Sequence, residues 1–364
     1  MKKILSIALA FILVFGLAAC GNGEGSNDGG RLRIAFGYGD WESALGIQFR
    51  ASFEYLSEAF DFEPVFFILG HGEDAVAAVE SLLAGGDIDG IMSSASWSVA
   101  SMLVADRHGV PVVTAAQFPA DQEIGSIAAF DTWLGGVTDN EFWAGYQTMR
   151  ALYNAGSRNV TWSGLTAGFS QGHDDRTRGA LQFVSENPSM NLLTESYTMG
   201  QWHGDVTTFV AVFPEMDGMA FTSMNNGVYN AMEVEGIADG SVLIAGTDVA
   251  SMTGDMFERG IQVWSAGGQY ATPMVAFAIL YSYLYDGTRI IPDTTRPIER
   301  NYLEITSFED YLVYSSLVGG DEPLYSADEI RQFITRYNPN VTFNDFVRAG
   351  QEFSLESVNA RRGN

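Results

Sequence analysis

Short apolar runs alternate with longer amphipathic stretches from residue 31 onward. The first apolar run precedes a stretch, residues 45–60, in which large apolar side chains recur near helical spacing. The same order repeats, with helices expected over residues 76–83 and up to residue 107. The strands expected in this first series are Leu32–Phe36, Val65–Ile68, Ile88–Met92 and Pro111–Thr114. This β-α-β-α order predicts a mainly parallel sheet with helices on both faces.

The pattern restarts near residues 135–140. Phe142, Tyr146, Met149 and Tyr153 are spaced 4, 3 and 4 positions apart, which predicts a helix that Asp139 can cap. Two further helices are expected to open near residues 174 and 226. The strands expected in this second series are Asn159–Ser163, Leu192–Glu195, Gly218–Thr222 and Val242–Ala245. Two such series side by side predict an α/β protein with two doubly wound parallel-sheet lobes.

The chain opens on a charged and then apolar stretch. Lys2 and Lys3 precede an apolar run over residues 4–17, and small residues lead into Cys20. This order is typical of a secretory signal peptide, here residues 1–19. A membrane span needs roughly 20 apolar residues, so the run is short for a transmembrane anchor. Residues 20–30 hold Gly, Ser, Asn and acidic side chains after the cysteine, which predicts a flexible tether.

The leader resembles the lipobox of bacterial lipoproteins. The resemblance implies cleavage before Cys20 and acylation of its thiol. It also implies an extracytoplasmic protein anchored by lipid to the cell membrane. Cys20 is the only cysteine, so we expect no disulfide in the processed chain.

The charge balance is strongly acidic. The formal net charge is −26, with 19 Lys and Arg against 45 Asp and Glu. Removal of the leader takes away both lysines and leaves 17 arginines against the same 45 acidic residues, a net charge of −28. Phosphates need cationic neutralisation, so this balance argues against nucleic acid as a partner. We expect the acidic surface to serve solubility.

Several motifs together resemble the ribose/galactose-type periplasmic binding proteins, which share a fold with LacI-type regulators. They occur in that family's order along residues 31–290. The motifs are Gly109-Val110-Pro111-Val112-Val113, Asp139-Asn140 with Ala144-Gly145, Arg176-Thr177-Arg178-Gly179, Phe221 to Ala231, and Leu243-Ile244-Ala245-Gly246-Thr247-Asp248. The resemblance implies the type I periplasmic-binding-protein fold, with two lobes joined by a three-strand hinge.

This fold implies lobes that are discontinuous in sequence. We expect the hinge crossings near residues 137, 267 and 292. The implied division is an N-terminal lobe of residues 31–137 and 268–291, a C-terminal lobe of residues 138–267 and 292–310, and a C-terminal extension of residues 311–364. Within the extension, residues 326–337 are expected to form an extra helix.

Polar residues that follow strands of the second series are candidate ligand contacts. In the family that the motifs resemble, the arginine at Arg176 donates hydrogen bonds to ligand oxygens, although Arg176 could instead pair with Asp174 or Asp175, and Arg178 is a competing choice. Asp248 can accept hydroxyl hydrogen bonds or can cap a helix. Either Asn225 or Asn226 is a candidate, and one of them is expected to cap the following helix. Gln269 lies near the crossing expected at residue 267, where the family often has a polar ligand contact. Gly267 could equally occupy the position of that contact.

Aromatic residues are the other candidates, because sugar rings and purines both stack on aromatic faces. Tyr38 and Trp41 follow the first strand, Trp97 follows the third, and Trp202 lies in the second lobe. Any single tryptophan is more often a core residue. After the Pro111–Thr114 strand, sugar binders of this type carry an Asp-Arg pair, whereas this chain has Gln117 and Phe118 there. This departure makes a nucleoside-like, aromatic or signalling ligand credible beside a sugar.

These observations predict a monomeric solute-binding lipoprotein that captures a small polar ligand and delivers it to an ABC permease. A ligand sensor for a membrane signalling receptor and a nucleoside-type binding protein are the alternatives, and an extracellular glycoside hydrolase is a further one. The four histidines are widely separated, and no G-x-S-x-G or phosphate-loop motif occurs. We therefore expect no catalytic residues, no metal site and no cofactor.

Overall fold

The structure of this protein is a computed structural model that describes residues 31–70, 73–95, 97–237, 239–320 and 323–363. Residues 33–364 form one compact unit, and the description concerns this unit together with the start of its first strand. The predicted signal peptide, Cys20 and the tether lie outside the described residues. Each strand expected from the apolar runs is present, with ends that differ by a few residues.

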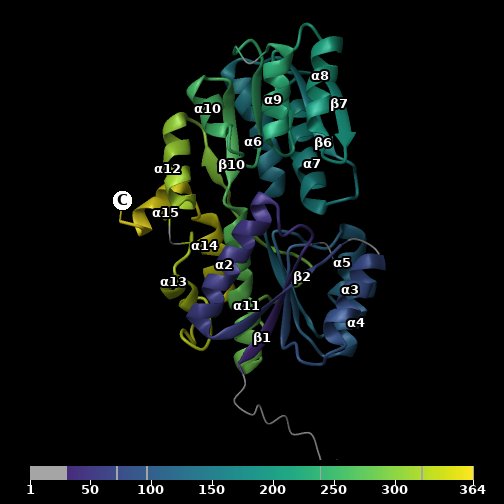
Figure 1. Cartoon of the computed structure of the whole chain (residues 1–364), viewed down its shortest axis with the longest axis vertical. Helices are drawn as coiled ribbons and strands as arrows, with labels where there is room; N and C mark the ends of the chain where they lie inside the picture. The colour runs from purple at the N-terminus through teal and green to yellow at the C-terminus, as the bar shows by residue number, and fades with distance from the viewer. Residues whose placement is uncertain (1–30, 71–72, 96, 238, 321–322, 364) are drawn as a thin grey trace, which may run out of the picture. The chain divides into compact units, whose positions relative to one another are not determined.

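The first lobe is built on a six-stranded sheet with strand order β11-β5-β4-β3-β1-β2. Its strands are β1 (Leu32–Tyr38), β2 (Phe62–Ile68), β3 (Gly90–Ser93), β4 (Val112–Ala115), β5 (Trp133–Asp139) and β11 (Ile298–Arg300). Strands β1, β3, β4, β5 and β11 pair in parallel, with Ile34 opposite Gly90 in the β1–β3 pair. Helices α2 (Ala44–Phe60) and α11 (Thr272–Asp286) pack beside this sheet, and α3 (Glu73–Leu83), α4 (Val99–Arg107) and α5 (Asp121–Ile127) pack together on its other side (Figure 1).

The second lobe repeats this plan with strand order β12-β10-β9-β8-β6-β7. Its strands are β6 (Asn159–Leu165), β7 (Asn191–Thr198), β8 (Gly218–Phe221), β9 (Leu243–Thr247), β10 (Gln262–Gly267) and β12 (Leu303–Ile305). The first five pair in parallel, and β12 pairs antiparallel with β10. Its helices are α6 (Glu141–Ala155), α7 (Gln171–Glu186), α8 (Trp202–Val212), α9 (Asn226–Glu235) and α10 (Thr253–Glu258). The architecture is therefore two parallel-sheet α/β lobes, as the alternating pattern predicts.

Two apolar clusters flank the sheet of the second lobe. One joins α8, α9 and α10 to it through residues such as Val206, Met219 and Tyr229, and the other joins α6 and α7 through residues such as Leu152 and Trp162. The predicted helix near Phe142 is α6, but Asn140 caps it, because the Asn140 side chain accepts a hydrogen bond from the Trp143 amide at 3.0 Å. The expectation that Asp139 caps this helix is wrong: Asp139 is buried and pairs with Arg300.

The chain passes between the two sheets three times. Strand β5 ends at Asp139 in the first sheet, and α6 then packs on the second. Strand β10 leads back through the 3-10 helix η1 (Gln269–Ala271) to α11 on the first sheet. The third passage lies at residues 301–302, between β11 and β12, whereas we expected it near residue 292. All three passages lie close to one another, since Arg300 contacts Asp139, Gly268 and Thr272.

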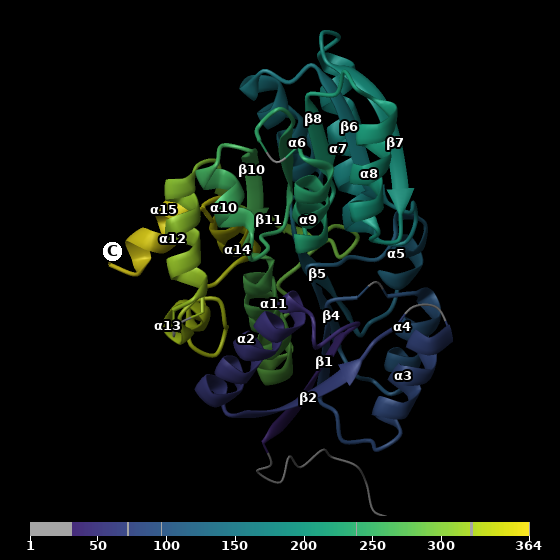
Figure 2. The same cartoon turned by 45° about the horizontal axis from the view of Figure 1, so that its top comes forward.

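The C-terminal segment, residues 308–361, contacts both lobes. Its helices are α12 (Phe308–Val318), α13 (Ala327–Arg331), α14 (Phe343–Gln351) and α15 (Leu355–Arg361). Helix α12 packs on α10 and β12 of the second lobe, α13 on α11 of the first, and α14 on β11 (Figure 2). The helix expected over residues 326–337 is shorter, because only Ala327–Arg331 is helical and turns follow. Among the described residues, no helix has the length and apolar character needed to cross a membrane.

Candidate functional site

A cavity of about 620 Å³ lies between the carboxyl ends of the two sheets. Residues of both lobes line it. Six of the predicted ligand contacts are among them, namely Tyr38, Gln117, Arg176, Asn225, Asp248 and Gln269. Parallel strands and helix N-termini direct their polar groups to this edge, so the topology explains why residues far apart in sequence meet here.

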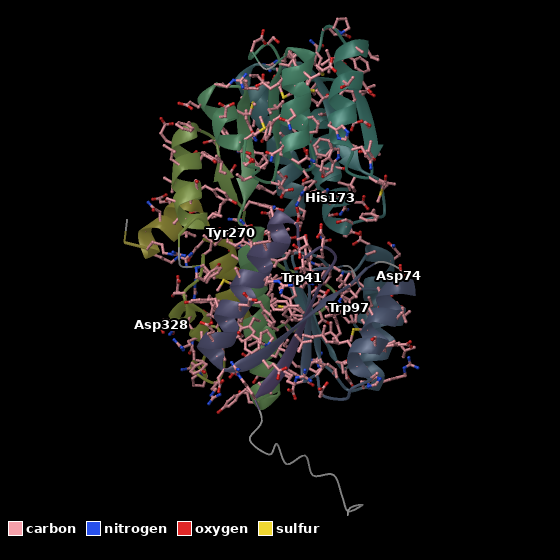
Figure 3. All side chains as sticks on the ribbon, viewed as in Figure 1. Trp41, Asp74, Trp97, His173, Tyr270 and Asp328 are labelled. Atoms are coloured by element: carbon pink, nitrogen blue, oxygen red, sulfur yellow. The ribbon has the colours of Figure 1, made fainter. Side chains whose placement is uncertain are left out.

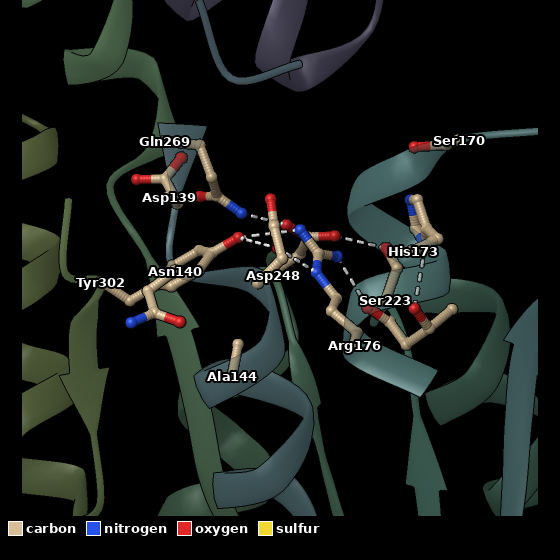
Figure 4. Close-up of polar contacts among 12 residues, drawn as sticks. Asp139, Asn140, Ala144, Ser170, His173, Arg176, Ser223, Asp248, Gln269 and Tyr302 are labelled. Carbon is tan, nitrogen blue, oxygen red and sulfur yellow. Dashed lines mark hydrogen bonds and ion pairs between the residues drawn. The ribbon is translucent and has the colours of Figure 1, made fainter. Parts of the chain in front are cut away.

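Asp248 directly follows β9 and carries the carboxylate of the site. Its carboxylate accepts hydrogen bonds from the Ser223 hydroxyl and, at 2.5 Å, from the Gln269 side-chain amide (Figure 4). A carboxylate has about four acceptor positions, so two protein donors leave capacity for ligand hydroxyls. Asp248 has a φ of 76°, in the left-handed region that costs a non-glycine residue about 1–2 kcal/mol. Its backbone holds this conformation, because its N–H donates to Ala266 at 2.8 Å and its carbonyl accepts from Ser265 at 2.7 Å.

Ala116 is the counterpart of Asp248 in the first lobe. It directly follows β4, has a φ of 62°, and donates its N–H to the neighbouring strand at Val137 with an N···O distance of 2.8 Å. Both lobes thus use the same backbone device at a strand end, but only the second lobe places a carboxylate there. Of the two strand ends, only that of the second lobe therefore supplies a carboxylate to the cavity. This agrees with the sequence, which lacks the Asp-Arg pair after β4 of the first lobe.

Arg176 is buried and is held by three protein acceptors. Its Nε donates to Glu141 Oε2 at 2.5 Å, Nη1 to the Thr222 carbonyl at 2.7 Å, and Nη2 to the Tyr302 hydroxyl at 2.8 Å. The Tyr302 hydroxyl in turn donates to Glu141 at 2.6 Å. Because a guanidinium has five N–H donors, two remain for a ligand. Burial raises the pKa of Glu141, and the attraction of Arg176 offsets part of that rise.

His173 stands beside Arg176 on α7. Its Nδ1 lies 2.9 Å from the Thr222 hydroxyl. Burial, with a further contribution from the nearby Arg176 cation, lowers the pKa of His173 well below its usual value. The imidazole is therefore neutral at pH 7 and can offer a donor and an acceptor. Sequence reasoning did not select His173, since a lone histidine carries no spacing signal.

Gln117 and Tyr38 form part of the first lobe's wall. The Gln117 side-chain carbonyl accepts a hydrogen bond from Ser170 at 3.1 Å, so this residue links the two lobes directly. Tyr38 packs edge-on against Trp41 and Phe49, and burial raises the pKa of its hydroxyl. The first lobe therefore presents neutral polar groups to the cavity.

The asparagine pair divides its roles. Asn225 caps α9, because its side-chain oxygen accepts from the Val228 amide at 3.1 Å. The Asn226 oxygen accepts from the Ser251 hydroxyl at 3.1 Å. Both residues nevertheless line the cavity.

Three predicted aromatic contacts lie in the cores and do not line this cavity. Trp41 is 8% exposed and donates its indole N–H to Phe67 at 3.0 Å, and Trp97 is 1% exposed in the first lobe's core (Figure 3). Trp202, the first residue of α8, is buried in the second lobe's core and donates its indole N–H to the Gly164 carbonyl. Residues that sequence reasoning missed include Ser43, Gln48, Ser94 and Tyr314, all of which line the cavity.

No protein-family model matches this sequence, and a search of curated proteins finds no relative. Solved structures do resemble it. A periplasmic solute-binding protein of an ABC transporter from Actinobacillus succinogenes with bound D-allose is 18% identical, with a TM-score of 0.66 over 78% of this chain and 100% of that one. An ABC transporter solute-binding protein from Bacillus halodurans with bound myo-inositol is 16% identical, with a TM-score of 0.64 over 79% and 99% of the two chains.

A third similar structure is the binding component of the arabinose ABC transporter from Shewanella, with bound L-arabinofuranose. It is 15% identical, with a TM-score of 0.64 over 78% of this chain and 95% of that one. At these identities the likenesses establish the fold, which is the type I periplasmic-binding-protein fold. The expected resemblance to ribose/galactose-type binding proteins is confirmed at this level.

Proposed function

We propose that this chain is an extracytoplasmic solute-binding lipoprotein that captures a sugar or another polyol between its lobes. The observation that carries the proposal is the Asp248 carboxylate, held by Ser223 and Gln269 and facing a cavity of about 620 Å³ between two lobes. A carboxylate with free acceptor positions suits ligand hydroxyl groups. The similar structures with bound allose, inositol and arabinofuranose support the same ligand class.

The residues of the cavity divide the recognition between the lobes. Asp248 accepts hydroxyl hydrogen bonds, and the free N–H groups of Arg176 donate to ligand oxygens. Across the cavity, Tyr38, Gln117 and Ser94 offer neutral polar groups. A ligand that satisfies both walls binds the closed arrangement better than the open one, so it shifts the population toward closure.

We further propose that the closed form is read by an ABC permease, to which a monomer delivers the ligand. The leader and Cys20 support a lipid anchor on the outer side of the membrane. For the lobes, we propose a division by sheet: β1–β5, β11 and α11 form one moving body, and β6–β10 and β12 form the other.

A thermal-shift screen tests the proposal. The processed chain with Cys20→Ser is melted with monosaccharides, polyols, nucleosides and amino acids. A ligand at a hundredfold excess over its dissociation constant stabilises by about 2.7 kcal/mol, so a sugar or polyol should raise the melting temperature. The ligand should also be recovered unchanged after incubation, which distinguishes a binding protein from a glycoside hydrolase.

Two variants locate the site. Asp248→Asn keeps the shape of the side chain and removes the charge. A hydrogen bond to a charged group contributes about 1.5–3 kcal/mol, so this variant should bind the sugar roughly tenfold to a hundredfold more weakly. Asp255→Asn, an exposed carboxylate on α10 of the same lobe, is the matched control and should bind as the parent does. A nucleoside hit would overturn the sugar assignment, and the absence of any hit would contradict the proposal.

A further inference from the structure

The C-terminal segment reaches the cavity through one side chain. Tyr314 of α12 lines the cavity and is 7% exposed. Its hydroxyl lies next to Gly267, the last residue of β10: a Cβ built on Gly267 would lie 2.5 Å from the Tyr314 Oη and 2.8 Å from its Cζ. Glycine at 267 therefore makes room for the phenol. Tyr314 occupies the space that a side chain from this strand end would otherwise fill.

The surroundings of Tyr314 join it to the ligand-facing groups. Burial raises the pKa of Tyr314, and the negative charge of Asp248 contributes to that rise, which places the hydroxyl in the electrostatic field of this carboxylate. Asp248 and Gln269 line the same cavity from β9 and η1. A phenol at this position offers a hydroxyl and an aromatic face together.

The segment that carries Tyr314 is fixed at several points. Helix α12 packs on α10 and β12, and α15 packs back on α12. Farther along, the Ala327 amide donates to the Tyr55 hydroxyl at 2.8 Å, and the Thr335 amide donates to the Ser282 hydroxyl at 3.1 Å. At the third passage, the Asn301 amide donates to the Gly350 carbonyl at 2.9 Å. Tyr314 is thus held by a segment anchored on both lobes and at the hinge.

We propose that Tyr314 is a ligand-contacting, specificity-determining residue, supplied to the cavity by the C-terminal segment 308–361. The inference rests on the proposed binding function. The hydroxyl hydrogen-bonds the ligand beside Asp248, and the ring limits the length of the sugar that the cavity admits. Removal of the phenol should therefore change the relative affinities for different sugars, and not only lower every affinity by the same factor.

The first test compares affinities across the sugars and polyols that bind the Cys20→Ser protein, with disaccharides added to the panel. Tyr314→Phe removes the hydroxyl, and with it the hydrogen bonds to the Gly268 backbone and to the ligand. The sugar that uses this hydroxyl should bind roughly threefold to tenfold more weakly, while the affinities of other sugars change less. Tyr314→Ala should improve binding of a disaccharide relative to a monosaccharide. Tyr311→Phe, one turn earlier on α12 and outside the cavity lining, should leave every affinity unchanged. Equal weakening of all sugars in Tyr314→Phe would overturn the proposal.

The second test needs no bound ligand. Cys20 is the only cysteine of the chain, so in the Cys20→Ser background a new cysteine is the single thiol. Tyr314→Cys should react with a small methanethiosulfonate reagent in the native state, because position 314 opens onto the cavity. Leu317→Cys, 3% exposed at the wild-type side chain and one turn later, should resist it.

The two tests separate failure of the inference from failure of the proposed function. If no sugar binds the Cys20→Ser protein, the proposed function and its specificity residue both fall, while reaction of Tyr314→Cys would still show that position 314 is a cavity wall. If sugars bind but Tyr314→Cys resists the reagent as Leu317→Cys does, the inference alone is overturned.

Discussion

Arg300 and Asp139 form a buried ion pair that ties together the three passages of the chain between the lobes. Arg300 Nη2 lies 2.6 Å from Asp139 Oδ1, and the two side chains are 1% and 0% exposed. The same nitrogen donates at 2.8 Å to the Gly268 carbonyl and to the Thr272 hydroxyl. Asp139 ends the first passage, Gly268 and Thr272 belong to the second, and Arg300 begins the third. One guanidinium therefore holds the hinge in register.

Replacement of Arg300 by Met should be strongly destabilising. The variant leaves the Asp139 carboxylate buried without its cation, and loss of one partner of a buried pair costs about 3–5 kcal/mol. The free energy of unfolding, measured by urea denaturation, should fall by this amount. Arg348→Met is the matched control, because it removes an exposed Arg–Asp pair with Asp345 and should cost less than about 1 kcal/mol. Equal losses in the two variants would contradict a hinge role for Arg300.

Close packing of α6 on α7 gives a second prediction. A Cβ added to Gly145 would overlap the Arg176 carbonyl oxygen, so the two helices approach each other only because Gly145 lacks a side chain. Gly145→Ala should lower the free energy of unfolding by about 3 kcal/mol, or displace α7 and with it Arg176. Gly204→Ala in α8 meets no atom within 4 Å and should instead stabilise by up to about 1 kcal/mol. Thermal denaturation of both variants checks the opposite signs.

Much of the fold could be predicted from the sequence because its signals are local. Each expected strand was an apolar run, and Asp248, Asn225 and Gln269 follow strands at the edge where parallel sheets bind ligands. Four of the described strands were not expected, namely β5, β10, β11 and β12. Strands β11 and β12 have three residues each, too few to carry a periodicity, whereas β5 and β10 have small and polar residues among their apolar ones. The third passage was expected near residue 292 from the family resemblance, but β11 keeps the chain in the first sheet as far as Arg300.

The contacts that complete the site are of long range. Tyr302 hydrogen-bonds Glu141 and Arg176, which are 161 and 126 residues away in the sequence. The residues next to each of the three carry no pattern that predicts this network. Tyr314 likewise reaches the cavity from a segment with no expected role. The three candidate tryptophans are buried and do not line this cavity. A residue's position after a strand does not determine which way its ring points, and a large apolar ring is stabilised by burial.

Trp41 tests this distinction directly. Its indole N–H donates to Phe67 and its ring packs edge-on against Phe36 and Phe66. Trp41→Phe removes one hydrogen bond and part of a buried ring, so the free energy of unfolding should fall by about 1–2 kcal/mol. The affinity for the sugar found by the screen should stay within about twofold of the parent value. A large loss of affinity at unchanged stability would contradict this expectation and show that Trp41 contacts the ligand.

The pH dependence of stability should report His173. Because the folded protein holds the pKa of His173 well below 6.5, the unfolded chain binds a proton that the folded chain does not as the pH falls below about 6.5. This histidine therefore contributes stability above pH 6.5 that is lost on acidification, with a slope of at most about 1.4 kcal/mol per pH unit.

In urea titrations from pH 8 to pH 5, His173→Gln should lose stability less steeply than the parent protein. If His173→Gln and the parent protein decline in parallel, the folded protein protonates His173 as readily as the unfolded chain does, and the lowered pKa of His173 is contradicted.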